Sequence, residues 1–176
     1  MFQVTISYIH NAHLKNMYKK SHNAKTIQKR CVINMNGDAE LLNYIYQNSQ
    51  MGTVTIKQLL DIVKDTGFES QLQSQYDEYK EINDSAKRLL NESGHDEKGI
   101  NAFEKMRTYL MINMQTLSDK STSHIAEMMI IGSNMGVIDS IKNIRRYKDA
   151  NPGILSLMEK LHATEENNIV SLKAFL

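Results

Sequence analysis

The sequence has few of the residues that interrupt helices. It contains one proline, Pro152, eight glycines and no tryptophan in 176 residues. A β-rich fold needs many turns, and turns draw on glycine and proline. The shortage therefore favours long helices joined by few loops. Eleven methionines, with aromatic residues at only 7%, indicate a pliable aliphatic core.

Cysteine and the common catalytic motifs are also scarce. Cys31 is the sole cysteine of the chain, which excludes an internal disulfide and any zinc site built from cysteines. The patterns GxGxxG, GxxxxGK[ST], GxSxG and HExxH do not occur. The sequence therefore favours a non-enzymatic protein over an enzyme.

Long apolar runs are missing as well. The longest lies around residues 128–131, far short of the roughly 18 residues that a membrane-spanning helix needs. The chain does not open with a charged segment followed by an apolar one, as a secretory signal would. We therefore expect no membrane span and a cytoplasmic location.

Acidic residues are absent from residues 1–37. Five lysines and one arginine give this stretch a charge of +6, so a net charge of +1 leaves −5 for the rest of the chain. Its weak helical amphipathy argues against a nucleic-acid partner, although its charge would suit one. We expect residues 1–37 to be a poorly ordered or non-native extension, and residues 38–176 to be a four-helix-bundle domain.

Helical periodicity is continuous from Asp38 onward. The pattern predicts bundle helices over 38–65, 68–92 and 122–148, and a fourth that begins after Asn151-Pro152. Asp38 is the expected N-cap of the first helix and Thr66-Gly67 its expected end. A methionine-rich helix containing Met106, Met111 and Met114 precedes a predicted break at residues 118–123. The predicted fold is all-α: an antiparallel four-helix bundle of two αα-hairpins, plus the methionine-rich helix before the third bundle helix.

An internal repeat supports two hairpins. Ser49-Gln50-Met51-Gly52 recurs as Ser133-Asn134-Met135-Gly136, 84 residues later. Glu78-x-x-Glu81-Ile82 aligns with Glu165-x-x-Asn168-Ile169 at an offset of 87. We interpret the repeat as a duplication of one hairpin. Its serines and glycines are expected to let the first helices of the two hairpins approach closely at the bundle centre.

With these repeats and the run Ile125-Ala126-Glu127-Met128, residues 38–176 resemble the ferritin-like superfamily. The likeness is closest to the uncharacterised ferritin-like bundle families of Gram-positive bacteria. Ferritin-like di-iron sites take one Glu from the first helix of each hairpin and Glu-x-x-His from the second. The resemblance assigns these positions to Gln50 and Asn134, to Glu78 with Glu81, and to Glu165 with Asn168.

This ligand set is degenerate. Both histidines are missing, and two of the four lone or leading carboxylates are replaced by the amides Gln50 and Asn134. An amide is neutral and binds metal weakly. We therefore expect the conventional di-metal centre to be lost and no cofactor to be bound. Gln50 and Asn134 are expected to hydrogen-bond each other across the bundle centre.

Two functions remain open. The first is a non-enzymatic bundle protein with a structural or interaction-mediating role, derived from a metal-binding bundle. Its partner would be a second copy of the chain or another protein. A weaker form of it has the methionine-rich segment 103–117 docking a partner. The alternative is an atypical metal-binding or redox protein that holds iron or manganese with Glu78, Glu81, Glu165 and His162. His162 and Glu165 read His-x-x-Glu and share a helix face.

Overall fold

The structure is a computed structural model that describes residues 37–94 and 119–176. All of these residues belong to one compact unit, Gly37–Leu176. They form four α-helices and a short terminal 3-10 helix, with no strand in the described ranges, so the predicted all-α fold is confirmed. The predicted extension, apart from Gly37, and the predicted methionine-rich helix lie outside the described residues.

The first hairpin consists of a helix over residues 37–60, called the first helix here, and α2 (Thr66–Glu92). The predicted end of the first helix at Thr66-Gly67 is wrong. Asp65 accepts a hydrogen bond from the Phe68 backbone N–H at 2.7 Å and caps α2. Thr66 and Gly67 therefore open α2 instead of closing the first helix. The predicted stop of α2 is confirmed, since Gly94 follows it with a φ of +69° that suits glycine.

Asp38 does not act as the predicted N-cap. Gly37 is already helical, and the Asp38 carboxylate accepts a hydrogen bond from the backbone N–H of Asn151 at 2.8 Å. Asn151 belongs to the loop between the last two bundle helices, 113 residues further along the chain. Asp38 therefore links the start of one hairpin to the turn of the other.

The second hairpin consists of α4 (Thr122–Arg146) and α5 (Pro152–Leu172), followed by η1 (Lys173–Phe175). Ser121 caps α4 by accepting from the His124 N–H, which agrees with the predicted break. Asn151 caps α5 by accepting from the Gly153 N–H, and Pro152 occupies the first turn as its missing N–H allows.

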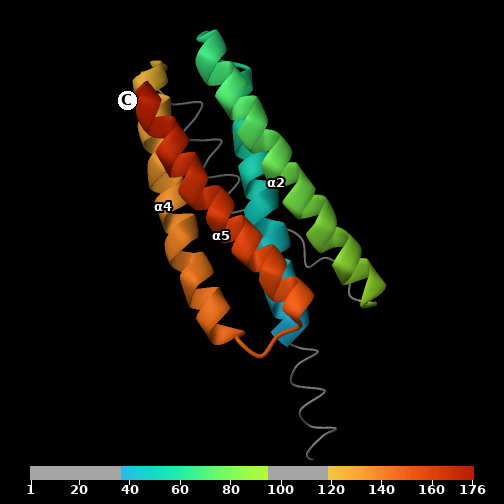
Figure 1. The fold of residues 1–176 in the computed structure, drawn as a ribbon. Coiled ribbons are helices and arrows are strands. Elements are labelled where there is room, and N and C mark those ends of the chain that lie inside the picture. Colours follow the sequence, from blue (N-terminus) through green and yellow to red (C-terminus); the bar gives the residue numbers. More distant parts are fainter. Residues whose placement is uncertain (1–36, 95–118) are drawn as a thin grey trace, which may run out of the picture. The chain divides into compact units, whose positions relative to one another are not determined.

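Neighbouring helices in the bundle run antiparallel (Figure 1). The two hairpins contact each other along α2 and α5, and next to α5 the ring of Phe175 in η1 lies 4.9 Å from the ring of Phe68 in α2. They also meet between the first helix and α4, where the Tyr147 hydroxyl donates to Glu40 at 2.7 Å. Each hairpin thus covers the apolar face of the other, and the described helices form a four-helix bundle.

The direction of α2 relative to α4 defines the topology. Figure 1 shows that both helices run the same way, so α2 ends at the opposite end of the bundle from the start of α4. Residues 93–121 therefore connect two ends of the bundle, whereas residues 61–65 and 147–151 are short turns. The bundle has one long crossover connection and two short ones.

The apolar core draws on all four helices. Its largest fully buried side chains are Leu41, Leu42, Ile45, Ile56 and Leu59 of the first helix, Phe68, Leu72, Ile82 and Leu90 of α2, Ile125 of α4, and Met158 and Leu161 of α5. Burial of this apolar surface is the main force that holds the helices together.

Candidate functional site

A polar cluster interrupts the apolar core near the middle of the bundle. Its centre is Glu165 of α5, which is only 4% exposed. The carboxyl group lies directly against Gly136 of α4, where an added Cβ atom would come within 2.7 Å of the carboxyl carbon. Gly136 therefore creates the space that the buried carboxyl occupies.

Two hydroxyl groups lie beside the Glu165 carboxyl group. Those of Tyr79 of α2 and Ser133 of α4 favour its charged form and so lower its pKa. The Tyr79 hydroxyl also accepts a hydrogen bond from the Asn168 amide at 3.2 Å. The second carboxyl oxygen, Oε2, has no hydrogen-bond partner among the described residues. Side chains from three helices thus converge on one carboxyl group, and we call Tyr79, Ser133, Glu165 and Asn168 the central cluster.

Burial dominates the electrostatics of the central cluster. It raises the pKa of Glu165 to about 7, against the lowering effect of hydrogen bonds from Tyr79 and Ser133. Burial and the nearby Glu165 charge hold the pKa of Tyr79 well above its usual range. Tyr44 of the first helix, whose pKa burial raises to about 12, also feels the charge of Glu165. Glu165 is therefore the one group of the cluster that changes charge near neutral pH.

The first hairpin has a related arrangement. An added Cβ at Gly52 would come within 2.7 Å of the Tyr79 ring, so Tyr79 lies over Gly52 as Glu165 lies over Gly136. The predicted reason for the two glycines is therefore wrong. Each receives a side chain from the second helix of its own hairpin, and neither brings the first helices of the two hairpins together.

The predicted Gln50–Asn134 hydrogen bond does not form. Asn134 is exposed, and its amide donates to the Ile130 backbone carbonyl of its own helix at 2.8 Å. Gln50 is half-buried, and its buried Oε1 has no partner in the described part of the chain. The inward residues at this level are instead the preceding ones, Ser49 at 0% and Ser133 at 5% exposure.

Of the Glu-x-x-His positions assigned by the resemblance, those on α5 belong to the central cluster and those on α2 do not. Glu165 and Asn168 both belong to the central cluster. Glu81 is exposed and forms an ion pair with Lys160 at 2.6 Å, while Glu78 is half-buried. At the level of the cluster, α2 points Tyr79 inward, so the second helices of the hairpins correspond at an offset of 86, not 87.

His162 does not join Glu165. Its Nδ1 lies 2.7 Å from the Ser140 hydroxyl, and its Nε2 lies 3.6 Å from Glu166. Across the described residues, no three histidine, cysteine, aspartate or glutamate side chains gather as a metal site would need. The four residues of the alternative metal hypothesis are therefore not brought together.

Two members of the central cluster were missed by the sequence analysis. Tyr79 has the spacing of the apolar residues on its helix face, so the pattern gives no sign of its polar contact. Ser133 enters the sequence analysis only as a small residue of the repeat. The signal that could have found Ser133 is that it and Ser49 are polar residues at core spacing.

None of the helices in the described ranges is both long and apolar enough to cross a membrane.

No protein-family model and no curated protein matches the chain. Among solved structures, the chain is similar to a DUF305 fragment from Deinococcus radiodurans, with a TM-score of 0.64 and 13% sequence identity. The match covers 78% of this chain and 93% of that one. At this identity the likeness concerns the fold alone.

Proposed function

We propose that this chain is a non-enzymatic helical-bundle protein with a structural or protein-interaction role, whose bundle derives from a ferritin-like metal-binding ancestor. The observation that carries the proposal is the central cluster. Where a metal-binding bundle concentrates carboxylates, the described helices of this bundle bury a single carboxyl group beside two hydroxyls. A cytoplasmic location and a bacterial source are further parts of the proposal.

The topology supports the ferritin-like origin. Ferritin-like bundles have one long crossover connection, which joins two hairpins. Here α2 and α4 run in the same direction and residues 93–121 join them, while both hairpins close through short turns. The likeness in fold to the DUF305 fragment extends over 78% of the chain and is consistent with a bundle of this kind.

The packing of Gly52 and Gly136 supports a duplication of one hairpin. The two glycines stand at equivalent places in the repeat, 84 residues apart, and each accommodates a large side chain from the next helix. Tyr79 and Glu165 are the side chains in question. We infer that the two hairpins share an ancestor and that this position diverged to Tyr in one and Glu in the other.

The residues present do not fit a di-metal centre. Two divalent ions carry four positive charges, and oxygen-rich sites balance them with several carboxylates. Within the described part of the chain, the central cluster contributes only Glu165, and a pKa of about 7 leaves even this group about half protonated at neutral pH. Stripping water from a divalent ion would be poorly compensated there.

The alternative function, iron or manganese binding by Glu78, Glu81, Glu165 and His162, would require these side chains to converge. Glu81 would have to leave Lys160, and His162 would have to leave Ser140. The bundle would also have to rotate α2 so that Glu78 replaced Tyr79. The contacts of Glu81 and His162 with other residues favour the non-enzymatic role.

The Glu165→Gln variant tests this proposal through the pH dependence of unfolding. The unfolded chain ionises Glu165 near its ordinary pKa of 4.5 and the folded chain near about 7. As pH rises between these values the unfolded state loses its proton first, so wild-type stability falls, and above them the loss levels off. The full loss is about 3 kcal/mol. We expect Glu165→Gln to abolish this pH-dependent loss. Relative to wild type, the free energy of unfolding of the variant should therefore rise by about 3 kcal/mol between pH 4 and pH 8.

The matched control is Glu159→Gln, an exposed glutamate on the same helix, which should show no such gain. Chemical denaturation at each pH measures the difference, and elemental analysis after dialysis against a chelator accompanies it. A Glu165→Gln variant that is less stable than wild type at pH 8, together with stoichiometric iron or manganese in wild type only, would establish the metal-binding alternative.

A further inference from the structure

The outward face of α4 carries large apolar side chains in a row. Ile131, Met135 and Ile138 are 56%, 60% and 52% exposed, and Ile141 borders them at 36%. The first three follow one another at steps of four and three residues, so they lie on one face of the helix. We call Ile131, Met135 and Ile138 the α4 stripe.

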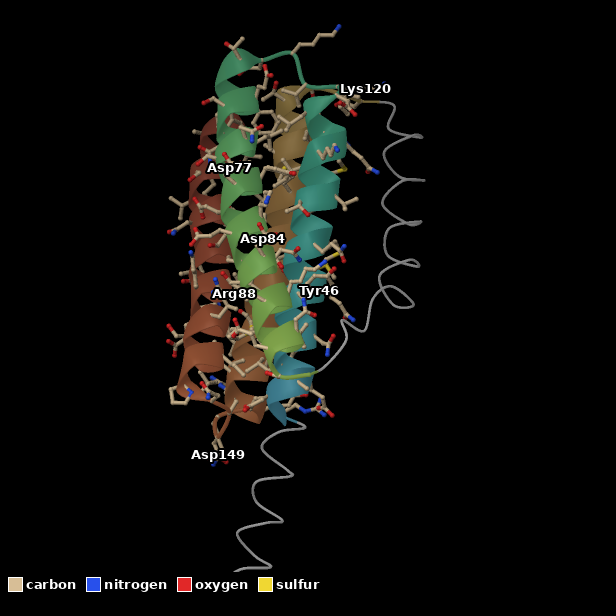
Figure 2. All side chains as sticks on the ribbon, turned by 90° about the vertical axis from the view of Figure 1, so that its right-hand side faces the viewer. Tyr46, Asp77, Asp84, Arg88, Lys120 and Asp149 are labelled. Atoms are coloured by element: carbon tan, nitrogen blue, oxygen red, sulfur yellow. The ribbon has the colours of Figure 1, made fainter. Side chains whose placement is uncertain are left out.

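The outer face of α2 differs from that of α4. It is charged, and Figure 2 shows Asp77, Asp84 and Arg88 along it. Lys80 and Asp84 form an ion pair at 2.7 Å on this face. Single exposed apolar residues are normal on protein surfaces, but a contiguous apolar row with a polar border is typical of an interface. The α4 stripe therefore has the character of an interface.

The charges at the two ends of the stripe indicate what that partner is. Glu127 lies one turn before Ile131 with its side chain 64% exposed, 3.8 Å from His124 of its own helix, and Lys142 lies one turn after Ile138 at 69%, where it also pairs with Asp139 of its own helix at 2.9 Å. The order along the face is acid, apolar, apolar, apolar, base. The midpoint between Glu127 and Lys142, and also between Ile131 and Ile138, falls between Asn134 and Met135.

Such a face is complementary to itself when reversed. If a second α4 packs antiparallel about a two-fold axis between Asn134 and Met135, each Ile131 meets Ile138 of the other copy. Each Glu127 then meets Lys142 of the other copy, twice by symmetry. A parallel pairing would instead set like charges side by side. We propose that the α4 stripe is the interface of an antiparallel, two-fold symmetric homodimer of this chain.

This inference rests on the interaction role proposed above and specifies the partner as a second copy. One helix face is a small interface, so the dissociation constant is expected to be on the order of micromolar. Sedimentation equilibrium of the full chain, over a micromolar to near-millimolar concentration series, should show a reversible monomer–dimer equilibrium. A chain that stays monomeric over the whole concentration series overturns the dimer proposal. It does not affect the tests of the proposed function, which depend on the pH dependence of unfolding and on metal content.

The Met135→Glu variant places two like charges beside the two-fold axis. We expect it to raise the dimer dissociation constant by about 30-fold or more, with helicity and melting of the monomer unchanged. Val170→Glu on α5 is the matched control, because Val170 is 67% exposed but lies on another helix, and it should leave the equilibrium unaltered. A Met135→Glu monomer that melts well below wild type would mean that the chain itself covers the stripe, which overturns the proposal.

A charge exchange tests the antiparallel arrangement. Glu127→Lys and Lys142→Glu should each weaken their own homodimer, since each sets like charges against one another. A mixture of the two should form a heterodimer, in which both contacts again join opposite charges. Native mass spectrometry of the mixture measures the heterodimer fraction. Failure of the mixture to exceed either homodimer overturns the proposed pairing.

Discussion

Three glycines of the described helices differ in what they face. Gly52 faces the Tyr79 ring and Gly136 the Glu165 carboxyl group, while a Cβ added at Gly132 would find nothing within 4 Å. Glycine within a helix costs about 1 kcal/mol relative to alanine. At Gly52 and Gly136 this cost is offset by the close packing of a side chain. At Gly132 no packing among the described residues offsets it.

The contacts of the three glycines therefore predict opposite effects on stability when each is replaced by alanine. Gly52→Ala should destabilise the fold by about 1 kcal/mol or more, because the clash falls on ring atoms close to the Tyr79 Cβ, which cannot swing away. Gly136→Ala should also destabilise, by less, since the Glu165 carboxyl lies at the end of a more flexible side chain. Denaturant melts of both variants measure the change.

Gly132→Ala is the control within the same helix as Gly136. With open space around it, the variant should gain up to about 1 kcal/mol from helix propensity alone. Equal effects at all three positions would contradict the assigned contacts. The measurements belong at low protein concentration, where association along α4 is negligible.

At the scale of the element, helix limits follow from short capping contacts. The Asp65 carboxylate accepts from the Phe68 N–H at 2.7 Å, and this contact fixes the start of α2. Asp65→Ala should therefore destabilise the protein by about 1 kcal/mol. Asp65→Asn should retain most of the stability, because the amide oxygen accepts the same hydrogen bond. Thermal unfolding of both variants decides this, and an Asp65→Ala protein that melts like wild type would exclude the capping role.

The helices themselves were predictable, but the rotation of each helix was less so. Apolar spacing and caps gave the predicted limits of α4 and the start of α5 to within two residues. The Thr66-Gly67 pair misled because glycine ends many helices, whereas here Asp65 begins one. For α2 the echo between Glu78 and Glu165 suggested a register that is wrong by one residue. Tyr79 satisfies both the apolar face and a polar contact, so periodicity alone could not distinguish the two.

The central cluster was therefore only partly foreseen. The prediction that Glu165 and Asn168 share an inward face agrees with their burial, at 4% and 2% exposure. The predicted partners on α2 and α4 were each displaced by one position, from Glu78 to Tyr79 and from Asn134 to Ser133. Neighbouring positions on a helix differ by 100°, so one residue separates a core side chain from an exposed one.

At the scale of the whole molecule, the compact unit Gly37–Leu176 contains every described helix. Deleting residues 1–34 should leave helicity and melting temperature nearly unchanged, because the buried apolar core is built from the bundle's own helices. Circular dichroism of the truncated and full chains compares them. Unfolding or aggregation of the truncated chain would show that residues 1–34 contribute to the fold and that the predicted domain boundary is misplaced.

The crossover topology also has a consequence for how the chain folds. Contacts inside the first hairpin join residues close in sequence, such as Ser49 and Asn83, 34 residues apart. Contacts between the hairpins join Tyr79 to Asn168 and Glu40 to Tyr147, which are 89 and 107 residues apart. Closing the longer loops costs more chain entropy, by about 1 kcal/mol. Each hairpin should thus form before the two hairpins dock. The buried carboxyl of Glu165 should lose its water only in this last step. Docking should therefore be the slow phase of folding, and the contacts between the hairpins should be the first to open in unfolding.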